Sequence, residues 1–221
     1  MGDWNKRDRY LAQVAERLLE GEKTFTLRRS HLVAPSGISR GTIYNHFPQE
    51  ADLVLALCRH RWSRSLERAE QLAAEAQSPL DAFLLHQCWL LWDQRFHKRF
   101  VLHRLMPNPD ILEAGSEPHR AAYKEAQRHY NDAYRHWVTD LSADRAFDRV
   151  ALVGSYIRGS LIQCDDDERC AEDPALYDQY AYGLCQLLGR SDRRGPSLAQ
   201  IRDKLAEWQA ESEPAQMRAR A

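Results

Sequence analysis

One short segment combines residues that could do chemistry with a spacing that exposes them together. Ile43 and Phe47 are four residues apart, so they share one face of a helix that begins after Ser39. The opposite face carries small and polar residues, namely Gly41, Thr42, Asn45 and His46. Side chains of this size and polarity suit base edges and phosphates in the major groove of DNA. The segment therefore predicts a helix that contacts nucleic acid.

Neighbouring elements must hold this segment in place, because helices shorter than about 12 residues are marginal in water. We predict a first helix over 4–20 and a second, short helix over 27–34. Gly37 can adopt the positive φ of the turn that follows, and Ser39 can cap the next helix. The expected small core consists of Leu27, Leu32, Ile38, Ile43 and Phe47. Residues 26–53 thus predict a helix-turn-helix, although an ordinary helical hairpin would show the same spacing.

The residues from Gly37 to Pro48, followed by Leu53, resemble the tetracycline-repressor (TetR) family. Members typically have Ala-Gly-Val-Ser-x-Gly-Thr-Leu-Tyr-x-His/Tyr-Phe there, then Ser-Lys-Glu and an apolar residue. The resemblance covers residues 26–53 of the 221-residue chain. It implies a homodimeric transcriptional regulator, most simply a repressor, that binds a palindromic double-stranded DNA operator and is released by a small-molecule effector.

The resemblance also implies which side chains contact DNA. The expected phosphate contacts come from Ser39, Tyr44 and His46, and the expected base contacts from Arg40, Thr42 and Asn45, with Gly41 allowing close approach. Arg28 or Arg29 would clamp the flanking backbone from the preceding helix, and Lys6 and Arg7 would do so from the N-terminal arm. For each of these cations, a solvated surface charge is the alternative.

Two positions depart from the family pattern. Glu50 stands where the family often has a lysine that meets a phosphate. A carboxylate suits the positive N-terminus of the next helix, but it would repel DNA unless a cation such as Arg28 compensates. Pro35 and Ser36 replace a small apolar pair, and Pro35 should cut the second helix short. Glu50 favours an alternative function, a helical binding or scaffold protein whose head has lost sequence-specific DNA binding.

The rest of the chain shows apolar residues at helical spacing, with Gly and Pro between the periodic segments. The expected helices cover 39–46, 49–76, 78–106, 118–141, 143–164, 174–188 and 197–210. We predict an all-α fold with an N-terminal three-helix helix-turn-helix DNA-binding domain over 1–48. A C-terminal helical ligand-binding and dimerisation domain follows over 49–189. Residues 190–221 are expected to form a linker, an extra amphipathic helix and a flexible tail.

Aromatic residues concentrate in the predicted ligand-binding domain. The pocket for an apolar or aromatic effector would be lined by residues of two helices: His86, Trp89, Trp92, Phe96, Phe100, Tyr123, Tyr130 and Tyr134. A filled core is the alternative for each of them.

Two further apolar stripes suggest a four-helix dimer interface. Its expected residues are Ile157, Leu161, Tyr177, Tyr180, Leu184 and Leu188. Packing within the chain would give the same periodicity, and so stays open.

Bulk composition narrows the class of protein. Residues 1–68 hold 12 Lys and Arg against 8 Asp and Glu, whereas the remainder holds 19 against 24, so the first third is basic and the rest acidic. Five dispersed cysteines argue against a disulfide framework, and no apolar run is long enough to span a bilayer. We expect a cytoplasmic protein that does not bind a membrane. Because no nucleophile–base pair, phosphate loop or metal-ligand spacing is evident, we expect neither an enzyme nor a cofactor or metal.

Overall fold

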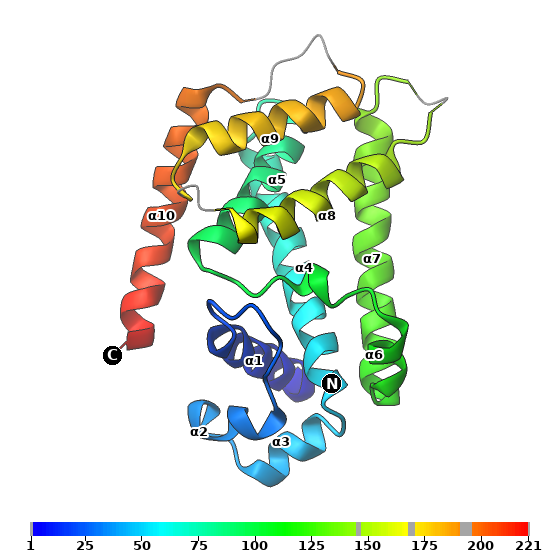
Figure 1. Ribbon diagram of the computed structural model, residues 1–221, viewed down its shortest axis with the longest axis vertical. Coiled ribbons are helices and arrows are strands. Elements are labelled where there is room, and N and C mark those ends of the chain that lie inside the picture. The colour runs from blue at the N-terminus through cyan, green and yellow to red at the C-terminus, as the bar shows by residue number, and fades with distance from the viewer. Residues whose placement is uncertain (1, 145–146, 168–170, 191–195, 221) are drawn as a thin grey trace. The chain divides into compact units, whose positions relative to one another are not determined.

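The computed structural model describes residues 2–144, 147–167, 171–190 and 196–220, with side chains from 4 to 212 (Figure 1). Within these residues the chain forms ten α-helices and two short 3-10 helices, and no strand. The predicted all-α fold is confirmed. None of the described helices is both long and apolar enough to cross a membrane.

The chain divides into two compact units that do not follow the predicted domain boundaries. Unit 1 comprises residues 1–70 and 97–136, and unit 2 comprises 71–96 and 137–221. The helices of unit 1 are α1 (Gly2–Leu18), η1 (Arg29–Leu32), α2 (Val33–Ser36), α3 (Arg40–His46), most of α4 (Ala51–Glu75), η2 (Leu102–Arg104), α6 (Pro109–Ala114) and most of α7 (Glu117–Leu141). Unit 2 holds the ends of α4 and α7, with α5 (Pro79–Phe96), α8 (Val150–Asp166), α9 (Pro174–Leu187) and α10 (Leu198–Arg220). The functional division at residues 48 and 189 stays a prediction.

A single apolar core explains why unit 1 extends beyond the helix-turn-helix. The predicted small core is present, because Leu27, Leu32, Ile43 and Phe47 are buried and Ile38 packs against them. The same cluster continues without a break into residues 53–58 of α4, Phe100, Met106 and Tyr123 of α7. The three N-terminal helices therefore share their core with α4 and α7 rather than forming a separate one.

The turn between α2 and α3 forms for the predicted local reasons. Gly37 has φ +65°, and a Cβ there would meet no neighbour, so only the backbone conformation favours glycine. The Ser39 hydroxyl accepts a hydrogen bond from the backbone N–H of Thr42 at 3.2 Å and caps α3. The predicted helix over 27–34 is instead a 3-10 turn followed by four-residue α2. Pro35 lies in the first turn of α2, where a missing N–H has little cost.

The predicted helix over 78–106 is wrong in its last ten residues, because α5 ends at Phe96. Lys98 has φ +45°, and its carbonyl accepts a hydrogen bond from Gly21 N–H at 2.8 Å. Phe100, Val101 and Leu102 then turn into the unit 1 core, where all three are buried. Burial of this apolar run outweighs continuation of the helix.

In unit 2, α5 packs against α8 and α9, and α10 packs against α9 (Figure 1). Trp92 of α5 stacks on Phe96 with 4.8 Å between ring centroids and lies 5.5 Å from the ring of Trp208 on α10. The predicted extra helix therefore covers an aromatic core. Its helical backbone continues to Arg220, through the segment expected to be a flexible tail.

Candidate nucleic-acid interface

The outward side of α3 and the turn before it carry most of the predicted DNA contacts. The exposed residues are Arg28, Ser39, Arg40, Gly41 and Asn45, whereas Thr42 and Tyr44 are half-buried. A Cβ added at Gly41 would meet nothing within 4 Å, so this part of the helix surface is open. The arrangement leaves room for another molecule's backbone to approach α3 closely.

Tyr44 is held between two guanidinium groups. The Arg29 guanidinium carbon lies 4.5 Å from the centre of the Tyr44 ring, and that of Arg40 lies 5.1 Å from it. Arg40 also reaches the Tyr44 hydroxyl at 3.5 Å. These contacts fix the ring while its hydroxyl sits beside a cation, an arrangement suited to a phosphate oxygen.

Glu50 is paired with Arg29. The Arg29 backbone N–H and Nε donate to the two carboxylate oxygens of Glu50 at 2.9 and 3.0 Å. Arg29 also donates to the Phe47 carbonyl at 2.9 Å, so it braces the end of α3. The pair offsets the negative charge of Glu50 beside the C-terminal end of α3. It also occupies Arg29 within the protein and leaves Arg28 as the exposed member of the predicted clamp.

His46 does not lie on the outward face, and this prediction is wrong. Its side chain is 1% exposed, with Nε2 at 3.1 Å from Asp8 Oδ1. Its ring packs 5.0 Å from Trp4 and 4.7 Å from Phe47, measured between ring centroids. His46 follows the buried Ile43 by three residues, and residues at i and i+3 share a helix face. It therefore turns inward in the last turn of α3.

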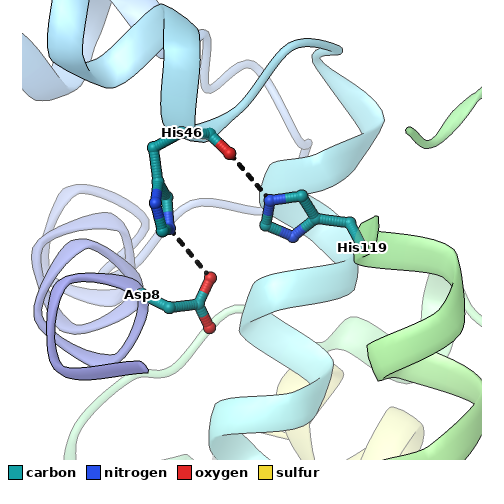
Figure 2. A group of neighbouring side chains, drawn as sticks. All are labelled: Asp8, His46 and His119. Atoms are coloured by element: carbon teal, nitrogen blue, oxygen red, sulfur yellow. Dashed lines mark hydrogen bonds and ion pairs between the residues drawn. The ribbon is translucent and has the colours of Figure 1, made fainter. Parts of the chain in front are cut away.

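The inward side of α3 ends in a buried polar cluster made by Asp8 of α1, His46 of α3 and His119 of α7 (Figure 2). His119 Nε2 lies 2.8 Å from the His46 main-chain carbonyl. Arg59 of α4 completes the arrangement, with one terminal nitrogen 2.9 Å from Asp8 Oδ1 and 3.1 Å from His119 Nδ1. Residues from four helices thus meet at the C-terminal end of α3.

Charge within this cluster is set by burial and by the neighbouring cations. Burial alone would raise the pKa of Asp8, but the hydrogen bond with His46 and the charge of Arg59 outweigh it and lower that pKa. Burial lowers the pKa of His119, which the hydrogen bond to the His46 carbonyl and the charge of Asp52 offset only in part. The cluster therefore favours an ionised Asp8 and a neutral His119.

A metal ion is one occupant that such residues could hold, since their nearest ligand atoms lie within 4.8 Å of one another. The hydrogen bonds work against it. A carbonyl can only accept, so His119 Nε2 carries a proton, and His119 Nδ1 accepts from Arg59. Both ring nitrogens of His119 are thus engaged, and the positive charge of Arg59 lies within 3.1 Å of both His119 Nδ1 and Asp8 Oδ1. The donor set fits a hydrogen-bond network better than a metal site.

Three solved structures match this arrangement of helices. AmtR from Mycobacterium smegmatis matches with a TM-score of 0.57 and 16% identity, over 90% of this chain and 92% of its own. RolR, solved without ligand, matches with a TM-score of 0.55 and 14% identity, over 89% and 95% of the two chains. SCO4454 from Streptomyces coelicolor, a TetR-family transcriptional regulator, matches with a TM-score of 0.54 and 12% identity, over 83% and 95%.

The chain has the TetR fold. No protein-family model and no curated protein matches the sequence. Identities this low establish the fold alone, so what the TetR-like chain binds has to be argued from its own residues.

The residues of the predicted effector pocket fall in both units of this TetR-like chain. In unit 2, His86 lies 5.5 Å from the Trp137 ring and 6.5 Å from that of Trp89, and Trp92 stacks on Phe96. In unit 1, the Trp62 ring lies 5.1 Å from Tyr123 and 5.9 Å from Tyr130. Phe100 packs against Phe25, and Tyr134 is half-buried. These rings contact one another as in a filled core, and the pocket stays a prediction.

The predicted dimer residues are mostly buried within one chain. Those at 4% exposure or less are Leu161, Tyr177, Tyr180, Leu184 and Leu188. The prediction is wrong for these five, because other helices of the same chain cover them: α8 packs against α5 and α9, and α9 also packs against α5 and α10. Ile157 is half-buried and stays a prediction. The apolar side chains that these helices do expose are Leu152, at 40%, and Tyr182, at 59%.

Proposed function

We propose that this protein is a TetR-family transcriptional regulator that binds a double-stranded DNA operator through α3. The observation that supports this most directly is the exposed polar face of a capped recognition helix within the TetR fold. Glu50 was the feature that favoured a head without DNA binding, and its pairing with Arg29 removes much of the expected repulsion. The regulator is therefore preferred over a scaffold protein.

In the proposed complex, Arg40 and Asn45 contact base edges, with Thr42 beside them. Arg forms two hydrogen bonds with guanine and Asn forms two with adenine in the major groove. The Ser39 and Tyr44 hydroxyls and Arg28 contact phosphates, which set the register without carrying sequence information. Gly41 supplies the open surface that lets the sugar–phosphate backbone approach.

A homodimer is part of the same proposal. Leu152 of α8 and Tyr182 of α9 are exposed apolar side chains on the two helices that the sequence stripes singled out. We propose that they lie at the contact between two copies. Two recognition helices then enter successive major grooves about 34–36 Å apart, which calls for a palindromic operator.

The proposed effector is an apolar or aromatic small molecule that releases a repressor from its operator. Unit 2 supports this with its aromatic rings and with Gln87, a buried residue of α5 whose Nε2 lies 3.2 Å from His86 Nδ1. Among the described residues, Gln87 Oε1 is buried without a hydrogen-bond partner. An unmade buried hydrogen bond costs about 1–3 kcal/mol, so a ligand carrying a donor would gain from meeting this oxygen.

The proposal is tested by selecting binding sites from fragmented genomic DNA with the full-length protein, then measuring affinity for the selected site by fluorescence anisotropy. We expect a palindromic site bound at least about 10³-fold more tightly than unrelated DNA. We also expect a log–log salt slope that reflects several phosphates at about −0.9 each. Failure to enrich any sequence, with a slope near zero, would reject DNA recognition and favour the scaffold alternative.

A further inference from the structure

The C-terminal end of α3 is held by a side chain from α7. The last carbonyls of a helix have no partner within it, and α3 ends at His46. The His46 carbonyl accepts its hydrogen bond from His119 Nε2 at 2.8 Å, across a separation of 73 residues. Both residues are buried, so no water is needed to complete the end of the recognition helix.

These hydrogen bonds form a closed ring that begins and ends at His46. The His46 carbonyl contacts His119, His119 accepts from Arg59, and Arg59 donates to Asp8 at 2.9 Å. Asp8 then lies 3.1 Å from Nε2 of the His46 ring (Figure 2). Both the main chain and the side chain of the last α3 residue are fixed by the same ring.

We propose that His119 is a positioning residue for DNA recognition, whose neutral imidazole holds the end of α3 through the His46 carbonyl. The inference rests on the proposed DNA binding. His119 itself is buried on α7, with 1% of its surface exposed, and contacts no DNA in this scheme. It acts through His46 on the orientation of Asn45, the preceding residue, and of Arg40, six residues earlier on α3.

The ring requires a neutral His119. Facing it are Asp8 from α1, His46 from α3, and Asp52 and Arg59 from α4. A second proton would sit on Nδ1 and point at the Arg59 guanidinium 3.1 Å away, so a donor and a like charge would replace an acceptor. Protonation therefore opens the ring at the contact between His119 of α7 and Arg59 of α4, the contact that orients the imidazole toward the His46 carbonyl.

A second hydrogen-bonded contact, between Asp52 and Ser116, holds the start of α7 independently of His119. Asp52 Oδ1 accepts from the Ser116 backbone N–H at 2.8 Å and lies 3.0 Å from the Ser116 hydroxyl. This contact joins the first turns of α7 and α4 and does not touch α3. The variant Ser116→Ala removes one partly buried hydrogen bond at the start of α7 without entering the ring, which makes it the matched control.

The experiment compares wild type, His119→Ala, His119→Gln and Ser116→Ala as full-length proteins. Affinity for the selected operator and for unrelated DNA is measured at pH 7.5 and 5.5, and thermal melting establishes that each variant is folded. We expect His119→Ala to weaken operator binding about ten-fold at pH 7.5, with unrelated DNA bound as before. Glutamine keeps an N–H donor but cannot be protonated at these pH values. His119→Gln should therefore restore operator affinity at pH 7.5 and make operator affinity less dependent on pH than that of wild type.

Three results of the DNA-binding assay would overturn the inference: equal operator affinity of His119→Ala and wild type, an equal loss in Ser116→Ala, or an undiminished pH step in His119→Gln. Hydrogen exchange of the α3 amides gives a readout without DNA. If wild type binds no operator, the proposed function fails and the inference fails with it. If wild type binds but His119→Ala binds equally and protects α3 equally, only the inference fails. Zn²⁺ bound by wild type and not by His119→Ala would assign the cluster to a metal and also overturn it.

Discussion

Different kinds of interaction stabilise the interior of each of the two units. In unit 1, Glu16 of α1 is buried with Arg61 of α4 at 2.8 Å and Arg99 at 3.1 Å, and Asp8 is buried with Arg59. In unit 2, Trp92 and its neighbouring rings fill the core, while the ion pair of Lys204 with Glu75 lies at the surface. Unit 1, which carries α3, therefore has buried carboxylates paired with arginines in addition to exposed ion pairs such as Arg9–Glu67.

This difference bears on what each unit can do. Buried ion pairs and hydrogen bonds are directional, so they fix one orientation of α1, α3 and α4 and penalise any other. Contacts between aromatic rings tolerate several arrangements and offer apolar surface to a ligand. The contrast fits a rigid DNA-reading unit and an effector-responsive unit, as the proposed function requires.

The largest expected effect comes from removing the charge at the centre of the unit 1 network. Glu16→Gln leaves Arg61 and Arg99 in a buried site without their carboxylate. Loss of one partner of a buried pair costs about 3–5 kcal/mol in the free energy of unfolding. Urea denaturation followed by circular dichroism measures it. The matched control is Glu67→Gln, because Glu67 pairs with Arg9 at an exposed site where such pairs contribute about 0–1 kcal/mol. Equal losses in the two variants would contradict the buried network.

The next effect concerns the outward face of α3. Asn45→Ala removes an exposed amide that we expect to read a base, so discrimination should fall by about 1–3 kcal/mol at one position in each half-site. Tyr44→Phe removes a phosphate contact and should weaken binding on all sequences alike. Competition anisotropy with single-base operator variants separates the two. A uniform loss for Asn45→Ala would show that this residue only positions the helix.

A pH titration of stability separates the histidines from the carboxylates of unit 1. Burial lowers the pKa of both His119 and His60 below 6.5, so the unfolded chain binds more protons than the folded one as pH falls through 6.5. Stability should therefore decline below pH 6.5, by up to about 1.4 kcal/mol per pH unit for each group.

A second decline should follow at lower pH. Burial opposes ionisation of Glu16, but Arg61 and Arg99 hold its pKa at about 2, well below 4.5. Its contribution is complete above pH 4.5 and is lost as pH falls from 4.5 towards 2. Denaturation of wild type and Glu16→Gln between pH 7.5 and 3 checks both steps. The variant should keep the upper step and show a smaller lower one, because Asp8 also has a lowered pKa and still contributes there. A single step in wild type near pH 4 would contradict the role of the histidines.

The sequence predicted the helix-turn-helix because its determinants are local. Gly37 at the turn, Ser39 at the cap and the i, i+4 pair Ile43 and Phe47 all act within a dozen residues. The inward position of His46 was also available from its three-residue spacing to Ile43, and the outward assignment overlooked it. The contacts of Asp8 and His119 with His46 could not be predicted from local spacing, because these residues are 38 and 73 positions away from His46 in the sequence.

The remaining differences share one physical cause. An apolar stripe shows that a helix face is buried but not by what. The stripe of α9 with Tyr177 and Leu184 is covered by helices of the same chain rather than by a second copy. Likewise, the apolar run after Phe96 continued the helical period, yet Phe100 and Leu102 leave the helix to enter the unit 1 core. Apolar periodicity predicts that a segment is helical and which face it buries, whereas tertiary contacts decide which residues cover that face.

The smallest expected effect concerns Glu50, where sequence and structure lead to different expectations. If its charge repelled DNA, Glu50→Gln would strengthen binding to every sequence. Because Glu50 is paired with Arg29 at a partly exposed site, and its loss also loosens the brace on the Phe47 carbonyl, we expect a change of less than about three-fold. Anisotropy at two salt concentrations checks this, with Arg29→Gln as the companion variant. Arg29→Gln leaves the carboxylate unpaired and should weaken binding more than Glu50→Gln changes it. A gain above ten-fold in Glu50→Gln would mean that the ion pair does not shield DNA from the carboxylate. The charge of Glu50, rather than the buried contacts of His46 at the end of α3, would then limit DNA affinity.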